Sequence, residues 1–325
     1  MCLPHTPHFI CRGRRALQKG FKRIDLRARK GLSEEWKDNL FGYALLLPTF
    51  AVFALVVLFP IFKAMVMSFC EYTYVTVKKG SSVWNHFANY KYIFDNGFLY
   101  QLSRTLLFTL GTVGIELILG MAIALLLNTN IRGRNIYRSL FLMSWTIPSI
   151  VTALLWKWLF NAQYGLVNFF GSSLGLLSNP NQLWLLDPKR AMATVIIAVV
   201  WRQTPYMLVM ILAGLQSINH DLIEAAVIDG ANVFQTFFRV MLPCIKTVLG
   251  NTLITCIMAS FQQFTIIYNM TGPLKQTMTM SIATYQMAFK EFNLGAGAAV
   301  GVIWMLVLGT GISIYNNATK RFDFE

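Results

Sequence analysis

The chain has 325 residues, of which 55% are hydrophobic and 13% charged, with a mean hydropathy of +0.52. This composition excludes a soluble domain and indicates an integral membrane protein. Its apolar runs are about 20 residues long and lack the alternation of an outer-membrane barrel, so we predict an all-α protein. The net charge of +14 comes from basic residues that flank the apolar runs, as membrane orientation requires, so we expect no nucleic-acid partner.

The first 40 residues are basic and contain no apolar run. We therefore identify no cleavable signal peptide and expect the first span to serve as the insertion signal. Arg and Lys at this density resist translocation and attract anionic headgroups, which predicts that residues 1–40 form a cytoplasmic N-terminal segment. A nucleic-acid-binding arm is the less favoured interpretation of such a run beside a membrane span.

Residues 41–325 are predicted to form one transmembrane domain of about six helices. The spans are expected at about residues 41–69, 102–128, 139–160, 191–215, 245–268 and 294–315. Pro48 and Pro60 interrupt the first span, and Pro148 interrupts the third. Basic residues crowd the short loop after the second span, which places that loop and both ends of the chain in the cytosol: Arg132, Arg134 and Arg138.

External loops are expected where interfacial or turn-forming residues follow a span. Residues 71–101 are rich in Tyr and Trp, which favour the membrane interface, so a loop with short surface helices is expected there. Residues 161–190 are rich in Gly, Ser, Asn and Pro, which predicts a second external loop.

Glu116 lies near the middle of the second span. An ionisable group at this depth is expensive, so it suggests a functional role such as a proton relay. The alternative is a buried carboxyl group that bonds to a neighbouring helix.

Residues 219–243, between the fourth and fifth spans, predict two short amphipathic helices on the membrane surface. Asp221 is expected to cap the first helix, and Gly230 to end it. Asn232 followed by Gln235 predicts a capping box for the second. The second helix would carry one apolar face, formed by Phe234, Phe237, Phe238 and Met241.

This stretch resembles the EAA loop of permease subunits of binding-protein-dependent ABC importers: Glu-Ala-Ala, three residues, Gly, nine residues, Ile, any residue, Leu-Pro. Val240 stands in the Ile position, and Pro243 is expected in the first turn of the fifth span. By this resemblance, residues 219–243 form a coupling loop whose contact residues are Glu224, Ala225, Ala226, Asp229, Gly230, Leu242 and Pro243. Residues 132–133, 145–148 and 156–168 also look like the carbohydrate-uptake, maltose-permease-like group, which implies a type I ABC importer permease fold.

The resemblance implies an assembly in the bacterial inner membrane. Its other members would be a second related permease, a dimer of ATP-binding subunits that grips the loop, and an extracytoplasmic substrate-binding protein. The chain lacks a Gly-x-x-x-x-Gly-Lys-Ser/Thr loop, so we expect a transport subunit rather than an enzyme, with ATP and Mg bound by the partner. We expect no cofactor or metal in this chain, which would be surrounded by membrane lipids.

Polar clusters interrupt the fourth span at residues 201–206 and the fifth at residues 260–269. Amides, hydroxyls and aromatic rings are the groups that hold sugars. Pro205 is expected to break the hydrogen-bond ladder of the fourth span. The resemblance to maltose-type permeases implies a substrate path formed by Arg202, Gln203, Tyr206, Ser260 and Gln263.

Arg202 departs from the maltose type, which has an apolar residue at this position. A guanidinium group suits carboxylate or phosphate, so Arg202 suggests an acidic oligosaccharide of the alginate type or a sugar phosphate. The alternative is that Arg202 pairs with a helix end or with Glu116. A permease for a neutral sugar or glycerol phosphate also remains open.

Two other classes of protein are less favoured. An ion-coupled secondary transporter could use Glu116 as its proton carrier, but the EAA pattern would then be coincidence. A membrane-embedded enzyme would need clustered acids, bases or metal ligands, and the histidines lie outside the spans: His5, His8, His86 and His220. The cysteines show neither metal-ligand nor disulfide spacing and are interpreted as structural: Cys2, Cys11, Cys70, Cys244 and Cys256.

Overall fold

The computed structural model describes residues 32–78, 83–129 and 131–322, so most of the predicted basic segment lies outside the described residues. The chain divides into two compact units, residues 1–63 and 64–325. Helix α2 (Leu32–Phe53) continues through the π-helical η1 (Ala54–Leu58) into α3 (Phe59–Ser68). The expected interruption of the first span by Pro48 and Pro60 is therefore wrong, because Asn39–Ser68 is one helical run. The wider π turn lies directly before Pro60, where the chain must accommodate a missing N–H.

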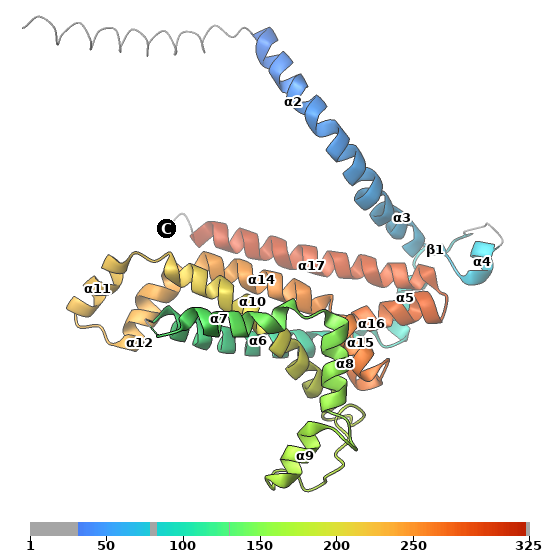
Figure 1. Ribbon diagram of the computed structural model, residues 1–325. Coiled ribbons are helices and arrows are strands. Elements are labelled where there is room, and N and C mark those ends of the chain that lie inside the picture. The colour runs from blue at the N-terminus through green and yellow to red at the C-terminus, as the bar shows by residue number, and fades with distance from the viewer. Residues whose placement is uncertain (1–31, 79–82, 130, 323–325) are drawn as a thin grey trace, which may run out of the picture. The chain divides into compact units, whose positions relative to one another are not determined.

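The second unit is a bundle of helices. In chain order its elements are β1 (Cys70–Glu71), α4 (Tyr74–Lys78), β2 (Val83–Trp84), α5 (Ala88–Asp95), α6 (Phe98–Asn128), α7 (Arg134–Thr146), α8 (Ser149–Leu159), α9 (Leu166–Ser173), α10 (Ala191–Gln216), α11 (His220–Ile228), α12 (Val233–Thr236), η2 (Phe237–Met241), α13 (Leu242–Cys244), α14 (Lys246–Phe261), α15 (Thr265–Thr271), η3 (Lys275–Thr277), α16 (Met280–Tyr285), η4 (Gln286–Lys290) and α17 (Leu294–Phe322). Helices α6, α7, α10, α14 and α17 run side by side, with α11 and α12 at one end and α5 and α16 at the other (Figure 1).

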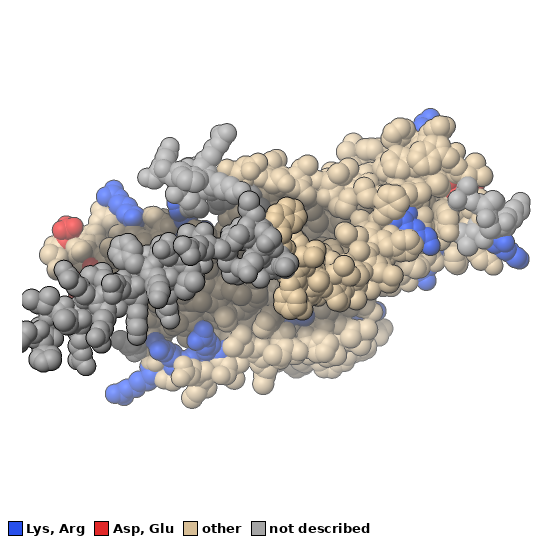
Figure 2. Space-filling model, turned by 90° about the horizontal axis from the view of Figure 1, so that it is seen from above, with Lys and Arg blue, Asp and Glu red and all other residues tan. Residues whose placement is uncertain are grey.

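The predicted number of membrane helices is confirmed. Among the described residues, four helical runs are long and apolar enough to cross a membrane, and two bent pairs raise the number to as many as six. One pair, α7 and α8, bends by 95° at the predicted break before Pro148. On the face shown in Figure 2, Lys and Arg gather toward the two ends of the molecule, and the surface between them is largely uncharged.

Helix α10 is the centre of the bundle and packs against α6, α7 and α14. Its inward side chains are apolar and fully buried, as at Met207 and Ile211. Gly120 of α6 lets the two backbones approach closely, because a Cβ atom there would lie 2.7 Å from the Met207 side chain. A methyl group at position 120 would therefore force the central helix pair apart.

The segment between α3 and α6 forms a small cap. The predicted short helices are present as α4 and α5, and an antiparallel pairing of β1 with β2 was not predicted. Asn89 of α5 donates to the carbonyls of Ser68 and Cys70, both at 2.9 Å. The backbone N–H of Gly295 donates to the carbonyl of Tyr72 at 3.1 Å, which joins the cap to the start of α17.

Pro205 does not end α10, which continues through it as one helix of 26 residues. The ladder does lose a bond, because proline cannot donate to the carbonyl four residues earlier, that of Trp201. The Ser144 hydroxyl of α7 donates to this carbonyl at 3.1 Å, and it shares its proton with the carbonyl of Phe141 in its own helix, also at 3.1 Å. A side chain from a neighbouring helix thus replaces the missing backbone donor, as is required where water is absent.

Replacing Ser144 should therefore destabilise the subunit only while Pro205 is present. We expect Ser144→Ala to lower the free energy of unfolding in detergent by about 1 kcal/mol, the contribution of one hydrogen bond. In a Pro205→Ala background, the restored N–H can satisfy Trp201, and the same substitution should cost much less. Ser139→Ala is a control, because that hydroxyl bonds only within α7, to Asn135 at 2.9 Å. Equal costs in the two backgrounds would contradict the assignment.

Candidate functional site

The first amphipathic helix, α11, is capped by Asn219 and not by Asp221 as predicted. Asn219 has an extended backbone, and its side-chain oxygen accepts from the N–H of Asp221 at 3.1 Å. Both residues can cap a helix, and Asn219 takes the role because the helix begins one residue before Asp221. Asp221 lies in the first turn, where its carboxylate favours the positive end of the helix dipole.

The end of α11 at Gly230 is confirmed. Gly230 has φ +82°, which glycine adopts without the strain that a side chain would add. Its N–H donates to Val227 at 3.0 Å, and the N–H of Ala231 donates to Ala226 at 2.9 Å. This pair of bonds is the Schellman motif, which fixes the direction in which the chain leaves the helix.

The second amphipathic helix begins with the predicted capping box. The N–H of Gln235 donates to the Asn232 side chain, and the N–H of Asn232 donates to the Gln235 side chain, both at 2.8 Å. Pro243 lies in the opening turn of a helix, as predicted, but this helix is α13, which is only three residues long. A bend of 73° separates it from α14, the long part of the fifth span.

These two helices present a mixed acidic and apolar surface at one end of the bundle (Figure 1). The Glu224 side chain is 64% exposed and lies 3.0 Å from His220, and Asp229 is also exposed. Large apolar side chains lie beside them in the open: Ile228, Val233, Phe234 and Phe238. Adjacent exposed apolar side chains with charges nearby are typical of a protein-binding surface.

Arg202 is bound to the end of a helix, one of the two alternatives set out above. Its Nε donates to the carbonyl of Ile147, the residue that follows α7, at 3.1 Å. Its Nη1 donates to the side chain of Gln203 at 3.2 Å. The guanidinium charge therefore lies at the negative end of the α7 dipole.

Three of the other predicted substrate-path residues, Tyr206, Ser260 and Gln263, make three separate contacts. Tyr206 packs on Trp145 of α7, with ring centroids 5.9 Å apart. Ser260 is buried and lies 3.1 Å from the hydroxyl of Thr112 on α6. Gln263 accepts through its backbone carbonyl from Ser281 at 2.9 Å. Within the described chain, no hydrogen bond joins the α10 cluster to the α14 cluster.

A groove of about 300 Å³ lies between α6, α7 and α10. It is lined by Ser144, Trp201, Thr204 and Pro205 and by apolar side chains of α6 and α7. The contribution of α7 was missed from the sequence, although the serine and tryptophan just before Pro148 are polar signals at a break. Elsewhere, no three His, Cys, Asp or Glu side chains of the described residues are grouped to hold a metal ion.

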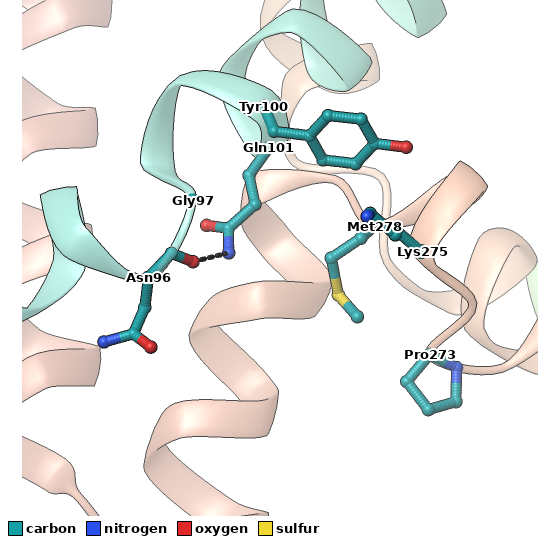
Figure 3. Close-up of a pocket in the computed structure, with 7 residues that line it drawn as sticks. All are labelled: Asn96, Gly97, Tyr100, Gln101, Pro273, Lys275 and Met278. Atoms are coloured by element: carbon teal, nitrogen blue, oxygen red, sulfur yellow. Dashed lines mark hydrogen bonds between the residues drawn. The ribbon is translucent and has the colours of Figure 1, made fainter.

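A second cavity, of about 410 Å³, lies where α5 leads into α6 (Figure 3), and Figure 1 shows α5 at the opposite end of the bundle from α11. Asn96, Tyr100 and Gln101 line one wall, and Pro273, Lys275 and Met278 line the other. An adjoining cavity reaches Tyr92 and Glu291, where the tyrosine hydroxyl donates to the carboxylate at 3.3 Å. Burial raises the pKa of Tyr92, and the negative charge of Glu291 raises it further.

Comparison of the sequence with known protein families identifies the family of this chain. The model of the binding-protein-dependent transport system inner membrane component matches residues 116–321. The chain belongs to this family. It is 34% identical over 279 residues to the trehalose/maltose transport system permease protein of Thermococcus litoralis, covering 84% of this chain and 92% of that protein. It is 33% identical to the sn-glycerol-3-phosphate transport system permease protein of Yersinia enterocolitica, covering 92% and 99%.

The fold is also found in a solved transporter. The structure matches a chain of a bacterial ABC transporter involved in the import of the acidic polysaccharide alginate, with a TM-score of 0.73 and 21% identity. The match covers 89% of this chain and 98% of that one. The predicted ABC importer permease fold is therefore confirmed, and the ion-coupled and enzymatic alternatives have no support from the family.

The capping box should hold the second amphipathic helix in place. We expect Asn232→Ala to weaken α12 by about 1 kcal/mol, measured as faster amide hydrogen exchange over residues 233–238. Asn232→Asp keeps the acceptor and should leave exchange nearly unchanged. An Asn219→Ala control should speed exchange in α11 instead. Unchanged protection in Asn232→Ala would show that packing, and not the cap, fixes this helix.

Proposed function

We propose that this chain is the permease subunit of an ATP-driven importer for oligosaccharides, coupled to its ATPase through residues 219–243. The proposal rests chiefly on one observation. The connector between the membrane helices α10 and α14 contains α11, capped by Asn219 and ended at Gly230, and α12, which begins with a capping box at Asn232. A rigid, exposed connector of this kind can transmit force to both helices, which a flexible loop cannot.

The remaining members of the assembly follow from the family. A binding protein delivers substrate on the outer side, and a second permease completes the passage. A pair of ATP-binding subunits holds ATP and Mg and grips the coupling loop, so this chain hydrolyses nothing itself. The coupling loop and both termini then lie in the cytosol, which agrees with the arginines at positions 132, 134 and 138. Closure of the ATPase dimer would rock the spans between inward-open and outward-open states.

The substrate is proposed to be an acidic oligosaccharide. Arg202 supports this, because its Nη2 has no bond among those of the described residues and guanidinium binds carboxylates well. The permease of Thermococcus litoralis is named for trehalose and maltose, which are neutral, and the bonds from Arg202 to Ile147 and Gln203 give this charge a structural role. A neutral oligosaccharide is therefore the second candidate, and Arg202 is the residue that distinguishes them.

Disrupting the Gly230 turn should abolish transport without preventing insertion. In Gly230→Pro the ring fixes φ near −65° and removes the N–H that bonds to Val227. We expect loss of ATP-dependent uptake and of ATPase co-purification, with normal amounts of subunit in the membrane. Glu224→Lys, which reverses an exposed charge, should do the same.

Gly175 provides a matched control for the turn. It ends α9 with the same pair of bonds, from Gly175 to Ser172 at 3.0 Å and from Leu176 to Gly171 at 2.8 Å, and has φ +69°. Gly175→Pro should therefore damage an equivalent turn while the ATPase subunits remain bound. Normal uptake in Gly230→Pro at wild-type subunit levels would refute the coupling role.

Arg202 should matter for acidic sugars only. We expect acidic oligosaccharides to stimulate the ATPase of the complete assembly, and Arg202→Met to reduce that stimulation about tenfold or more, the value of a charge-assisted hydrogen bond. Arg202→Lys keeps the positive charge but loses the planar pair of guanidinium donors, so its ATPase stimulation should lie between that of the wild type and that of Arg202→Met. Ser144→Ala loosens the same α7–α10 junction and should affect all sugars equally. Stimulation of the wild type by neutral sugars alone would exclude the acidic substrate.

A further inference from the structure

Helix α6 carries a polar face that is buried in the protein. Gln101, Thr105, Thr109, Thr112 and Glu116 follow one another at intervals of four, four, three and four residues, which places them on one side of the helix. None of them is more than 8% exposed. Threonine is common where membrane helices pack together, but a buried glutamine and a buried glutamate on the same face are expensive there.

Three of the five side chains bury a polar atom that has no hydrogen-bond partner. These atoms are Oε1 of Gln101, Oγ1 of Thr109 and Oε1 of Glu116. The sequence left open that Glu116 forms a hydrogen bond to a neighbouring helix, and Oε1 of Glu116 forms no such bond. Each such atom costs free energy, and one helix face with three of them is maintained at a cost to stability. Local rules are typically broken where function requires it.

Helices α14 and α16 cover this face and make two hydrogen bonds to it. The backbone N–H of Met280, at the start of α16, donates to Thr105 at 2.9 Å. The hydroxyls of Thr112 and Ser260 lie 3.1 Å apart at the end of α14. Helix α16 has six residues, and α14 ends one residue beyond Ser260.

The outer end of the polar face opens into the cavity of Figure 3. Gln101 is the first residue of the face and also lines this cavity, beside Tyr100 and Lys275. Lys275 and Arg104 lie over the Tyr100 ring, at 5.7 Å and 4.7 Å from its centroid. Amide, aromatic and cationic groups thus surround the mouth of a polar track that leads inward to Glu116.

We infer that the α6 face from Gln101 to Glu116 is a wall of the passage for a polyhydroxylated substrate. It is closed against α14 and α16 in this conformation. When the outer side opens, these helices separate from α6, and water and the substrate's hydroxyl groups bond to the three unpartnered atoms. The inference rests on the proposed import function, and none of the substrate-path residues predicted from the sequence lies on α6.

Thiol labelling can test whether the face becomes hydrated. Thr109→Cys is introduced into a chain whose native cysteines are replaced by alanine, assembled with its partners in lipid nanodiscs. A charged, water-soluble thiol reagent should react about tenfold faster when ATP and vanadate trap the outward-open state than in the resting state. Val113→Cys is the matched control, because Val113 is equally buried on α6 but lies in an apolar cluster with Leu208 of α10. It should stay protected in both states.

The outcomes separate this inference from the import function. ATP-dependent uptake is measured on the cysteine-free assembly with Thr109 intact and on the Thr109→Cys assembly, where loss of the hydroxyl is expected to reduce uptake but not abolish it. Uptake with Thr109→Cys protected in both states would overturn the inference and leave the import function standing. Equal labelling of Thr109→Cys and Val113→Cys would also overturn it, since general loosening would explain the result. Absence of ATP-dependent uptake by the unmutated chain would instead refute the import function.

A second variant gives a readout that a structural role would not produce. Thr109→Val replaces an unpartnered hydroxyl with a methyl group of similar shape, so the subunit should melt at a higher temperature. Uptake should nevertheless fall several-fold, because a hydroxyl that meets water or substrate in the open state has been lost. Thr310→Val, on an exposed face of α17, is the control and should leave uptake unchanged. Higher stability with undiminished uptake would contradict the inference.

Discussion

The junction between α7 and α10 is the constraint on which the membrane bundle depends. Two carbonyl groups lack backbone donors there: Trp201 because of Pro205, and Ile147 because α7 ends before Pro148. Each is met by a side chain from the other helix, Trp201 by Ser144 and Ile147 by Arg202. The two bonds are reciprocal, so the 95° bend and the unbroken α10 stabilise each other.

Features that follow from local chemistry could be predicted from the sequence. The six apolar runs, the stop at Gly230 and the capping box at Asn232 each depend on a few neighbouring residues, and all three are found. The errors arise where two local rules compete or where a distant residue decides. Asn219 and Asp221 can both cap a helix, and the continuity of α10 at Pro205 depends on Ser144, 61 residues earlier in the chain.

The polar face of α6 also could not be predicted, because its threonines depend on distant residues for their meaning. Glu116 stands out in an apolar run because it is charged, whereas the threonines beside it scarcely change the average hydropathy of the span. Their hydroxyls become informative only when the structure shows which helices cover them and which atoms have no partner. Conversely, Ser260 was identified through a family resemblance, and its bond to Thr112 connects the predicted path to the unpredicted face of α6.

The two ends of the coupling loop connect it to both sides of this face. Helix α10 leads into α11 with only three residues between them, and α13 leads into α14 across the 73° bend. Both α10 and α14 pack against α6. The two helices also pack against each other, so a force on the turn at Gly230 would act on both of them and, through them, on α6. The apolar cluster that joins α6 to α10 also includes Cys256 of α14. The polar face toward α14 and α16 differs from it, because it makes two hydrogen bonds to these helices and contains unpartnered atoms. That face is the weaker contact, so it is where such a force would open the bundle.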